Sequence, residues 1–163
     1  MQDRFKFRYN NNNKIYDVSA IDFTRSRGEI VSIDGMETLI CKLNLNNLIQ
    51  CTGLKDKNGK LIYEGDIVKD LTYLHEVKYV CAFLPIFGGL GLISNQDLKD
   101  YEFCKENWED YTINDEVRKR DNRFRLANQG NKLTCFNMNN LKTDNFEVVG
   151  SLYENPELIK DGE

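Results

Sequence analysis

The first third of the chain alternates apolar and polar residues with the two-residue period that is typical of half-buried β-strands. An asparagine run at positions 10–13 supplies the first turn, and Asp34-Gly35 between two apolar runs is a strong signal for a second hairpin. The pattern places the strands at 5–9, 15–18, 29–33 and 37–43. The first fifty residues therefore predict a small antiparallel meander.

Glycines separate the apolar runs in the middle of the chain. Residues 52–60 predict a polar loop in which Asn58-Gly59 forms a tight turn, and Gly65-Asp66 predicts the entry to a strand of a small barrel. The glycines at 88–91 predict a tight turn, since they lack the lysine and hydroxyl residue of a phosphate-binding loop. Further strands are expected at 77–83, at 132–137 and within 146–153, and a helical turn from Asn155-Pro156.

Residues 94–126 break the β pattern and predict an α-helical insertion. Ser94 followed by Asp97 is typical of a capping box at a helix N-terminus. Apolar residues then recur every three to four positions, which places on one helical face Leu98, Tyr101, Cys104, Trp108 and Tyr111. A second, shorter helix is expected after Asn114, with one side formed by Val117, Asp121 and Phe124.

Composition and charge narrow the class of protein. With 163 residues, 40% of them hydrophobic, and a net charge of −4, the chain is expected to fold, and its acidity argues against a strongly basic nucleic-acid binder. No apolar run approaches the roughly 18 residues of a membrane-spanning helix, and the N-terminus lacks the apolar block of a signal peptide. We therefore expect a cytoplasmic protein without membrane contact.

The five cysteines are at least ten residues apart and form no Cys-x-x-Cys pair. Free thiols are the expectation, and the single histidine, His75, leaves no spacing that is typical of a zinc site. Glu64 and Asp66 form a carboxylate pair, but turn chemistry explains the pair better than a hydrolase or nuclease site does. We therefore expect no cofactor, no metal and no enzymatic activity.

Two motifs carry a resemblance to a known family. The first runs from Thr52 to Val68 (TGLKDKNGKLIYEGDIV) and the second from Phe146 to Leu158 (FEVVGSLYENPEL). In this order they resemble the YopX family of phage and prophage proteins, with a looser likeness at residues 4–8 and 15–16. The chain departs from the family pattern at Tyr9, which replaces a tryptophan, at Cys51, which replaces an aromatic residue, and across residues 94–126.

The resemblance implies a mainly β protein of phage or prophage origin, with an SH3-like barrel around the strand that begins at Gly65-Asp66, and it implies no particular reaction. The expected organisation is an N-terminal β meander over residues 1–50 and an SH3-like barrel domain over residues 51–163, with the helical insertion at about 94–126.

Structural demands alone explain the residues of both motifs. Glycines occur where a turn or a close approach of strands is expected, and Asp56 and Asp66 are placed to accept hydrogen bonds from turn amides. Positions suited to packing are Tyr63, Ile67, Val68, Val148 and Leu152. The motifs therefore indicate architecture more than an active site.

The insertion carries the most informative charge pattern. Residues 97–116 hold eight acidic residues against two lysines, and residues 117–126 hold five basic residues against Asp121. The two blocks either neutralise each other or form a partner site. The aromatic residues nearby either cover the barrel or form an exposed interface. The candidate partner-binding residues are Tyr101, Trp108, Tyr111, Arg118, Lys119, Arg120, Arg123, Phe124 and Arg125.

Two functional hypotheses follow. The leading one is a non-enzymatic phage or prophage protein that binds a host or phage protein, such as a defence component, through residues 94–126; a homo-oligomer is equally compatible with this surface. The alternative is a nucleic-acid or nucleotide binder that uses the basic cluster at 118–125, helped by Arg4, Lys6 and Arg8. Binding that weakens steeply with salt would favour the alternative.

Overall fold

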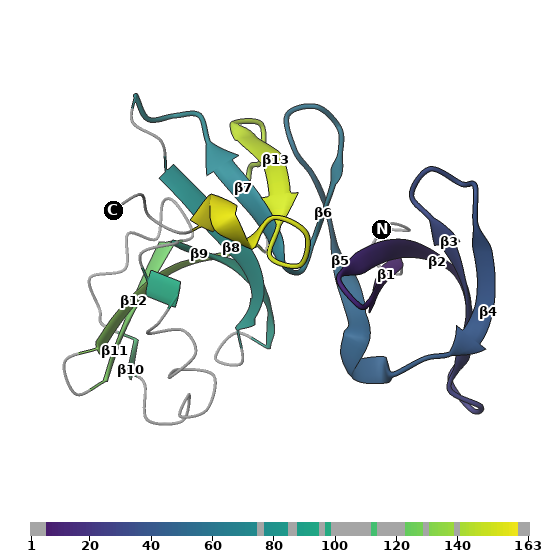
Figure 1. Ribbon diagram of the computed structural model, residues 1–163. Coiled ribbons are helices and arrows are strands. Elements are labelled where there is room, and N and C mark those ends of the chain that lie inside the picture. Colours follow the sequence, from purple (N-terminus) through teal and green to yellow (C-terminus); the bar gives the residue numbers. More distant parts are fainter. Residues whose placement is uncertain are drawn as a thin grey trace.

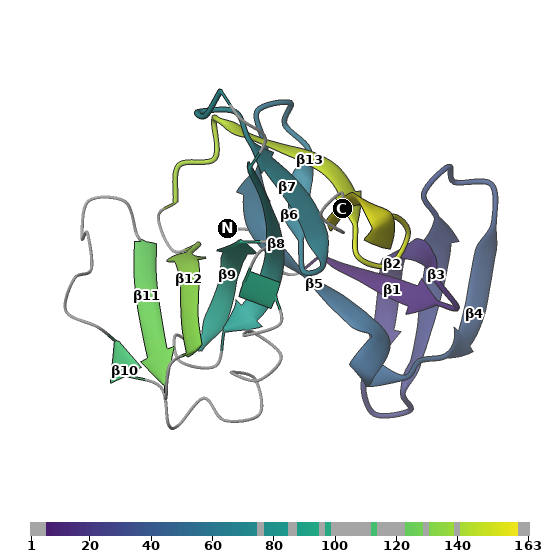
Figure 2. The same ribbon diagram turned by 60° about the vertical axis from the view of Figure 1, so that its left-hand side comes forward.

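A computed structural model shows two antiparallel β-sheets that lie side by side (Figure 1, Figure 2). The structure describes residues 6–74, 77–84, 88–94, 97–98, 112–113, 123–128, 131–138 and 141–159, and for the strands between 112 and 137 it describes the backbone alone. Of these residues, none belongs to a helix that is long and apolar enough to cross a membrane. The mainly β character that the sequence predicts is confirmed.

The N-terminal strands form a six-stranded sheet in the order β4-β3-β2-β1-β5-β6. Its elements are β1 (Phe7–Asn11), β2 (Lys14–Asp22), β3 (Arg27–Ser32), β4 (Thr38–Lys42), the 3₁₀ turn η2 (Leu45–Asn47), β5 (Leu48–Lys55) and β6 (Leu61–Tyr63). Asn12 and Asn13 adopt the left-handed conformation, with φ of 52° and 66°, which a two-residue hairpin turn requires. The asparagine turn and both N-terminal hairpins are therefore confirmed.

The remaining strands form a seven-stranded sheet in the order β10-β11-β12-β9-β8-β7-β13. Its elements are β7 (Asp66–Asp70), β8 (Val77–Leu84), β9 (Gly89–Ser94), β10 (Thr112–Ile113), β11 (Arg123–Asn128), β12 (Asn131–Asn137) and β13 (Phe146–Ser151), followed by the 3₁₀ turn η6 (Pro156–Ile159). The strands predicted near 77–83, 132–137 and within 146–153 are confirmed, as is the helical turn at Pro156.

The β5–β6 hairpin links the two sheets, and Figure 1 shows it between them. The first half of β5 pairs with β1 and its second half pairs with β6. The hairpin turn lies along the outer edge of β13, where the Lys57 N–H donates a hydrogen bond to the Phe146 carbonyl at 2.9 Å. The predicted boundary between units 1–50 and 51–163 falls inside β5. The division into these two units stays a prediction.

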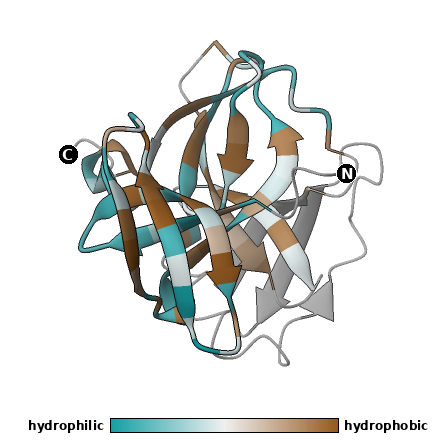
Figure 3. Cartoon of the chain, turned by 90° about the vertical axis from the view of Figure 1, so that its right-hand side faces the viewer, coloured by the Kyte–Doolittle hydropathy of each residue, from teal (hydrophilic) through white to brown (hydrophobic). Residues whose placement is uncertain are grey.

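Alternating side chains pack into buried clusters, and Figure 3 shows the matching bands of apolar and polar residues along the strands. The cluster inside the N-terminal sheet contains Tyr9, Tyr16, Ile30 and Leu43. The cluster where β5 and β6 leave that sheet contains Ile15, Ile49, Cys51 and Tyr63. The cluster of the C-terminal sheet contains Ile62, Val68, Tyr79, Cys81, Leu92, Met138 and Phe146.

Two finer predictions of fold require correction. The described strands form two open sheets and no closed barrel, so the SH3-like barrel is not confirmed. The helical insertion at 94–126 is not confirmed: Thr112–Ile113 and Arg123–Asn128 are strands, and among the described residues of this range only 97–98 have helical conformation. Residues 123–126 read Arg-Phe-Arg-Leu, a two-residue alternation that suits the observed pairing of β11 with β12. The rest of the insertion lies outside the described residues.

Strand pairing also overrides turn propensity at two places. Residues 52–55 belong to β5 and not to a loop, because a register shift relative to β6 accommodates Gly53, whose φ is 78°. Residues 89–91 belong to β9, paired with β8, and of residues 88–91 it is Gly88, with φ of 59°, that lies in a turn. The glycine-rich sequence therefore marks a bulge in one case and a strand start in the other.

Candidate functional site

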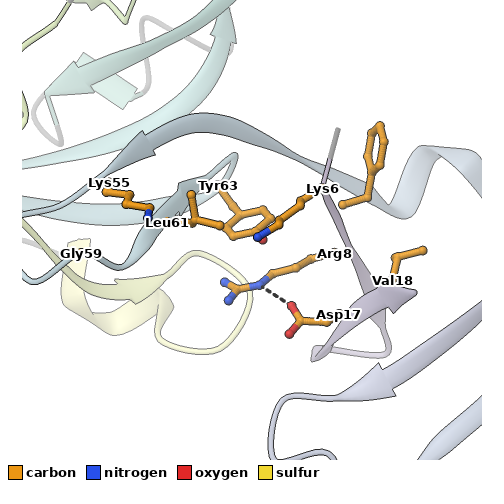
Figure 4. Close-up of a pocket in the computed structure, with 9 residues that line it drawn as sticks. Lys6, Arg8, Asp17, Val18, Lys55, Gly59, Leu61 and Tyr63 are labelled. Carbon is orange, nitrogen blue, oxygen red and sulfur yellow. Dashed lines mark hydrogen bonds and ion pairs between the residues drawn. The ribbon is translucent and has the colours of Figure 1, made fainter. Parts of the chain in front are cut away.

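A cleft of about 500 Å³ opens between the β1–β2 hairpin and the β5–β6 hairpin. β5 pairs with β1 only over its first residues, and the register shift between Cys51 and Lys55 bends the strand beyond them. Figure 4 shows the side chains that face the cleft from both hairpins. The lining residues are Lys6, Phe7, Arg8, Asp17, Val18, Lys55, Gly59, Leu61 and Tyr63.

Arg8 is a cation of the cleft that contacts both Asp17 and Tyr63. Cross-strand pairing sets Asp17 of β2 directly opposite Arg8 of β1, and the Arg8 Nε donates a hydrogen bond to Asp17 Oδ1 at 3.1 Å. The Arg8 side chain is only 18% exposed, whereas that of Asp17 is 53% exposed. The terminal guanidinium nitrogens of Arg8 have no hydrogen-bond partner among the residues that the structure describes. Asp17 therefore fixes the guanidinium and leaves its outer donors available.

The aromatic ring of Tyr63 packs against the same guanidinium. The Arg8 Cζ lies 4.0 Å from the centroid of the Tyr63 ring, a distance at which the electron-rich face attracts a cation. Tyr63 is buried, and burial raises the pKa of its hydroxyl to about 12. The ring therefore stays neutral at physiological pH and acts as a fixed platform for Arg8 (Figure 4).

The charge of the cleft is positive. Three of its lining residues, Lys6, Arg8 and Lys55, are cations, and Asp17 is the one acid among the lining residues. Lys6 and Arg8 are two residues apart in an extended segment, so their side chains lie on the same side of the chain. Such a cluster in a partly enclosed space favours an anionic group.

A smaller cavity of about 190 Å³ adjoins the cleft, and Arg8 and Tyr63 line both. The buried carboxylate of Asp66 lines this cavity, and its Oδ2 accepts a hydrogen bond from the Tyr63 N–H at 2.9 Å. Burial raises the pKa of Asp66 to about 6, although this hydrogen bond opposes the shift. The prediction that Asp66 serves a turn amide is confirmed.

In the described part of the chain, Glu64 and Asp66 do not belong to a group of side chains that could hold a metal ion. Glu64 lies half-buried in the turn before β7. Among the described residues, no group of three or more histidine, cysteine, aspartate or glutamate side chains is arranged to hold a metal ion. The lining of the cleft, with three cations and one acid, suits the binding of an anionic group.

Most of the residues predicted as the partner site lie outside the part of the chain that the structure describes. Six of them lie outside the described residues: Tyr101, Trp108, Tyr111, Arg118, Lys119 and Arg120. The other three, Arg123, Phe124 and Arg125, lie in β11, of which only the backbone is described. Their role as a contact surface stays a prediction.

The sequence indicated two of the three cations of the cleft, Lys6 and Arg8, but not the cleft itself. The alternation of Lys6 and Arg8 with apolar residues was recognisable as a strand with one basic side. Asp17, Lys55 and Tyr63 were not recognised as parts of a site, because they come from a different strand or a different hairpin. The spacing of charges along the chain gives no signal for such a juxtaposition.

The comparison with known families adds one finding. The sequence model of the YopX protein family matches residues 6–160, which is nearly the whole chain and includes both motifs and every residue of the cleft. No curated protein matches the chain significantly.

Proposed function

The chain belongs to the YopX protein family, and from that premise we propose that it is a non-enzymatic binding protein, encoded by a phage or prophage, that acts in the bacterial cytoplasm. Its described binding site is the basic cleft, and its ligand there is an acidic segment of a host or phage protein. The observation that carries this proposal is the placement of Arg8, held between Asp17 and Tyr63 with its terminal nitrogens available.

The geometry of Arg8 suits a carboxylate. Guanidinium groups bind carboxylates through two parallel N–H donors, and the bond is stronger where the guanidinium is already oriented. The Nε of Arg8 is engaged by Asp17, so an incoming carboxylate meets the outer nitrogens. Lys6 and Lys55 line the same cleft and provide charge for a second acidic side chain of the partner.

The insertion at 94–126 supplies a further contact surface in this proposal. Its aromatic residues and its blocks of opposite charge are of the kinds found at protein interfaces. The edge strand of the C-terminal sheet, β10, pairs only with Leu126 and Ala127 of β11, so residues 123–125 of β11 have no strand partner on that side among the described residues. The cleft and the insertion would then contact different parts of one partner.

The proposal is tested by fluorescence anisotropy with a labelled hexaglutamate peptide, against hexaglutamine as the uncharged probe. We expect hexaglutamate to bind and hexaglutamine not to bind. The double variant Lys6→Ala/Lys55→Ala should weaken hexaglutamate binding about tenfold or more, because two cleft cations are removed. The matched control is Lys14→Ala/Arg25→Ala, which removes two cations of the same sheet that do not line the cleft.

Equal losses in the two double variants would show that the peptide responds to net charge and would contradict a specific site. Absence of hexaglutamate binding by the wild-type protein at low salt would overturn the cleft as the binding site. Thermal unfolding of each variant shows whether a loss of binding reflects a loss of fold.

A nucleic-acid or nucleotide binder is the second candidate function. The observation that favours it is the same group of three cations, which also suits phosphates, together with the basic cluster at 118–125. Against it, the Tyr63 ring is 4% exposed and its face is covered by Arg8, so it offers no surface for base stacking. A single-stranded oligonucleotide that displaces hexaglutamate, with a steep salt dependence, would favour this candidate.

A further inference from the structure

β4 forms an outer edge of the six-stranded sheet, as Figure 1 shows. Among the described strands it pairs with β3 alone. Hydrogen bonds link Ser32 N–H to the Glu37 carbonyl at one end of this pair and Leu43 N–H to the Ser26 carbonyl at the other end. Because hydrogen-bonded pairs alternate in antiparallel sheets, Leu39 and Cys41 also direct their backbone groups toward β3.

The same alternation directs the remaining backbone groups of β4 outward. The N–H and carbonyl groups of Thr38, Ile40 and Lys42 point away from β3. No described strand accepts or donates hydrogen bonds on that side. The edge therefore presents three donors and three acceptors at regular spacing.

The C-terminal sheet shows how another edge of this protein is covered. The outer edge of β13 receives the β5–β6 turn, through the Lys57 N–H to Phe146 carbonyl bond of 2.9 Å and through the Asp56 carboxylate, which accepts from the Val148 N–H at 3.0 Å. Natural proteins cover or charge their edge strands because open edges pair with other chains. β4 has no such cover among the described residues.

Two large apolar side chains at this edge are exposed to solvent. Ile40, in the middle of β4, is 78% exposed, and Met36, just before the strand, is 89% exposed. On the inner side, Leu39 and Cys41 are half-buried against the N-terminal cluster. Both faces of the edge therefore gain apolar contact if another strand is added.

We propose that β4 pairs in antiparallel fashion with β4 of a second copy of this chain, centred on Ile40. In this register Ile40 lies opposite Ile40 of the second copy, and Thr38 lies opposite Lys42 of the second copy. Every outward-facing backbone group of one strand then meets an outward-facing group of the other, as hydrogen-bonded pairs require. The two six-stranded sheets become one continuous sheet across a two-fold axis.

Charge supports the same register. Lys42 is the one charged residue within β4, and here it faces a threonine. A shift that centres the pair on Cys41 sets Lys42 against Ile40, and a shift that centres it on Lys42 sets two lysines against each other, which is unfavourable. On the inner face, the proposed register sets Leu39 against Cys41 of the second copy, so apolar residues meet on both faces.

The oligomeric state tests the proposal directly. Light scattering coupled to size exclusion should give twice the 19.0 kDa of one chain at micromolar concentration. Ile40→Lys should give the monomer, because it sets two further lysines against each other at the centre of the interface. Phe23→Lys is the matched control: Phe23 is 61% exposed in the turn between β2 and β3, so this variant should remain dimeric. A monomeric wild type, or a dimer that persists in Ile40→Lys, would overturn the proposal.

A disulfide tests the register. In a non-hydrogen-bonded antiparallel pair the Cα atoms are about 4.5 Å apart, within the range of a disulfide. Leu39→Cys should therefore give a covalent dimer under mild oxidation, through Cys41 of the second copy, while the wild type should not, since its two Cys41 residues are not opposite each other. A covalent dimer of the wild type, or none with Leu39→Cys, would contradict the register centred on Ile40.

Discussion

The carboxylate of Asp56 accepts a hydrogen bond from the Val148 N–H at 3.0 Å, across 92 residues of sequence. Its other oxygen accepts from the N–H groups of Asn58 and Lys60, both at 2.9 Å. Asp56 belongs to the first family motif and Val148 to the second. One buried carboxylate therefore closes the β5–β6 turn and ties it to β13, so it links the two motifs directly.

Asp56→Ala should lower the free energy of unfolding by about 3 kcal/mol, because three backbone donors lose a charged acceptor. Urea unfolding followed by circular dichroism measures the change. The control Asp144→Ala removes an exposed carboxylate near the same strand and should change stability by less than about 0.5 kcal/mol. Similar stabilities for Asp56→Ala and the wild type would show that the turn does not depend on this contact.

The sequence was sufficient to predict that Asp56 serves turn amides, since an aspartate two residues before Asn58-Gly59 is a local signal. It did not predict the bond to Val148, because the partner is set by the packing of β13 along the hairpin and not by local spacing. The basic cleft was missed for the same reason: Lys55 and Arg8 line one cleft because of the way β5 is placed between β1 and β6, which local spacing does not reveal. Local periodicity predicts strands and turns, whereas the site depends on how distant strands are arranged.

Ionisation of Asp66 should lower the free energy of unfolding as the pH rises above about 4. Burial raises the pKa of Asp66 from 3.8 to about 6, so the folded state binds the proton more tightly than the unfolded state does. The stabilisation is fully present below pH 3.8 and is lost as the pH rises through about 6. Between pH 4.5 and 7 the loss amounts to about 2 kcal/mol.

The measurement compares urea unfolding of the wild type and of Asp66→Asn at pH 4.5 and pH 7. Asparagine retains an acceptor for the Tyr63 N–H but does not titrate. The wild type should lose about 2 kcal/mol more than Asp66→Asn over this interval. Asp56 does not contribute to this difference. Burial alone would raise its pKa, but backbone hydrogen bonds outweigh burial and lower the pKa, so its contribution to stability is lost only in stronger acid. Parallel pH profiles for the two proteins would refute the assignment to Asp66.

Gly65 and Gly59 offer a matched pair for separating backbone strain from steric contact. Both adopt the left-handed conformation, with φ of 81° and 82°. A Cβ atom at Gly65 would lie 2.5 Å from Cε2 of Tyr153, whereas a Cβ atom at Gly59 would have no neighbour within 4 Å. Gly59→Ala should therefore cost about 1 kcal/mol, the strain of the conformation, and Gly65→Ala should cost about 2–4 kcal/mol because the tyrosine ring must move. Equal losses would show that the ring moves without cost.

Asp17→Asn gives the sharpest test of the cleft as an anion site. The substitution removes the one negative charge among the lining residues, while the Oδ1 of asparagine still accepts from the Nε of Arg8, so hexaglutamate should bind roughly three- to tenfold more tightly. Asp22→Asn removes the same charge from the end of β2, outside the cleft, and should change the affinity less than twofold. The difference between the two variants should shrink at high salt, since Asp17 is half-exposed and its charge is screened. Equal affinities of Asp17→Asn and Asp22→Asn for hexaglutamate would contradict the cleft as the site at which the peptide binds.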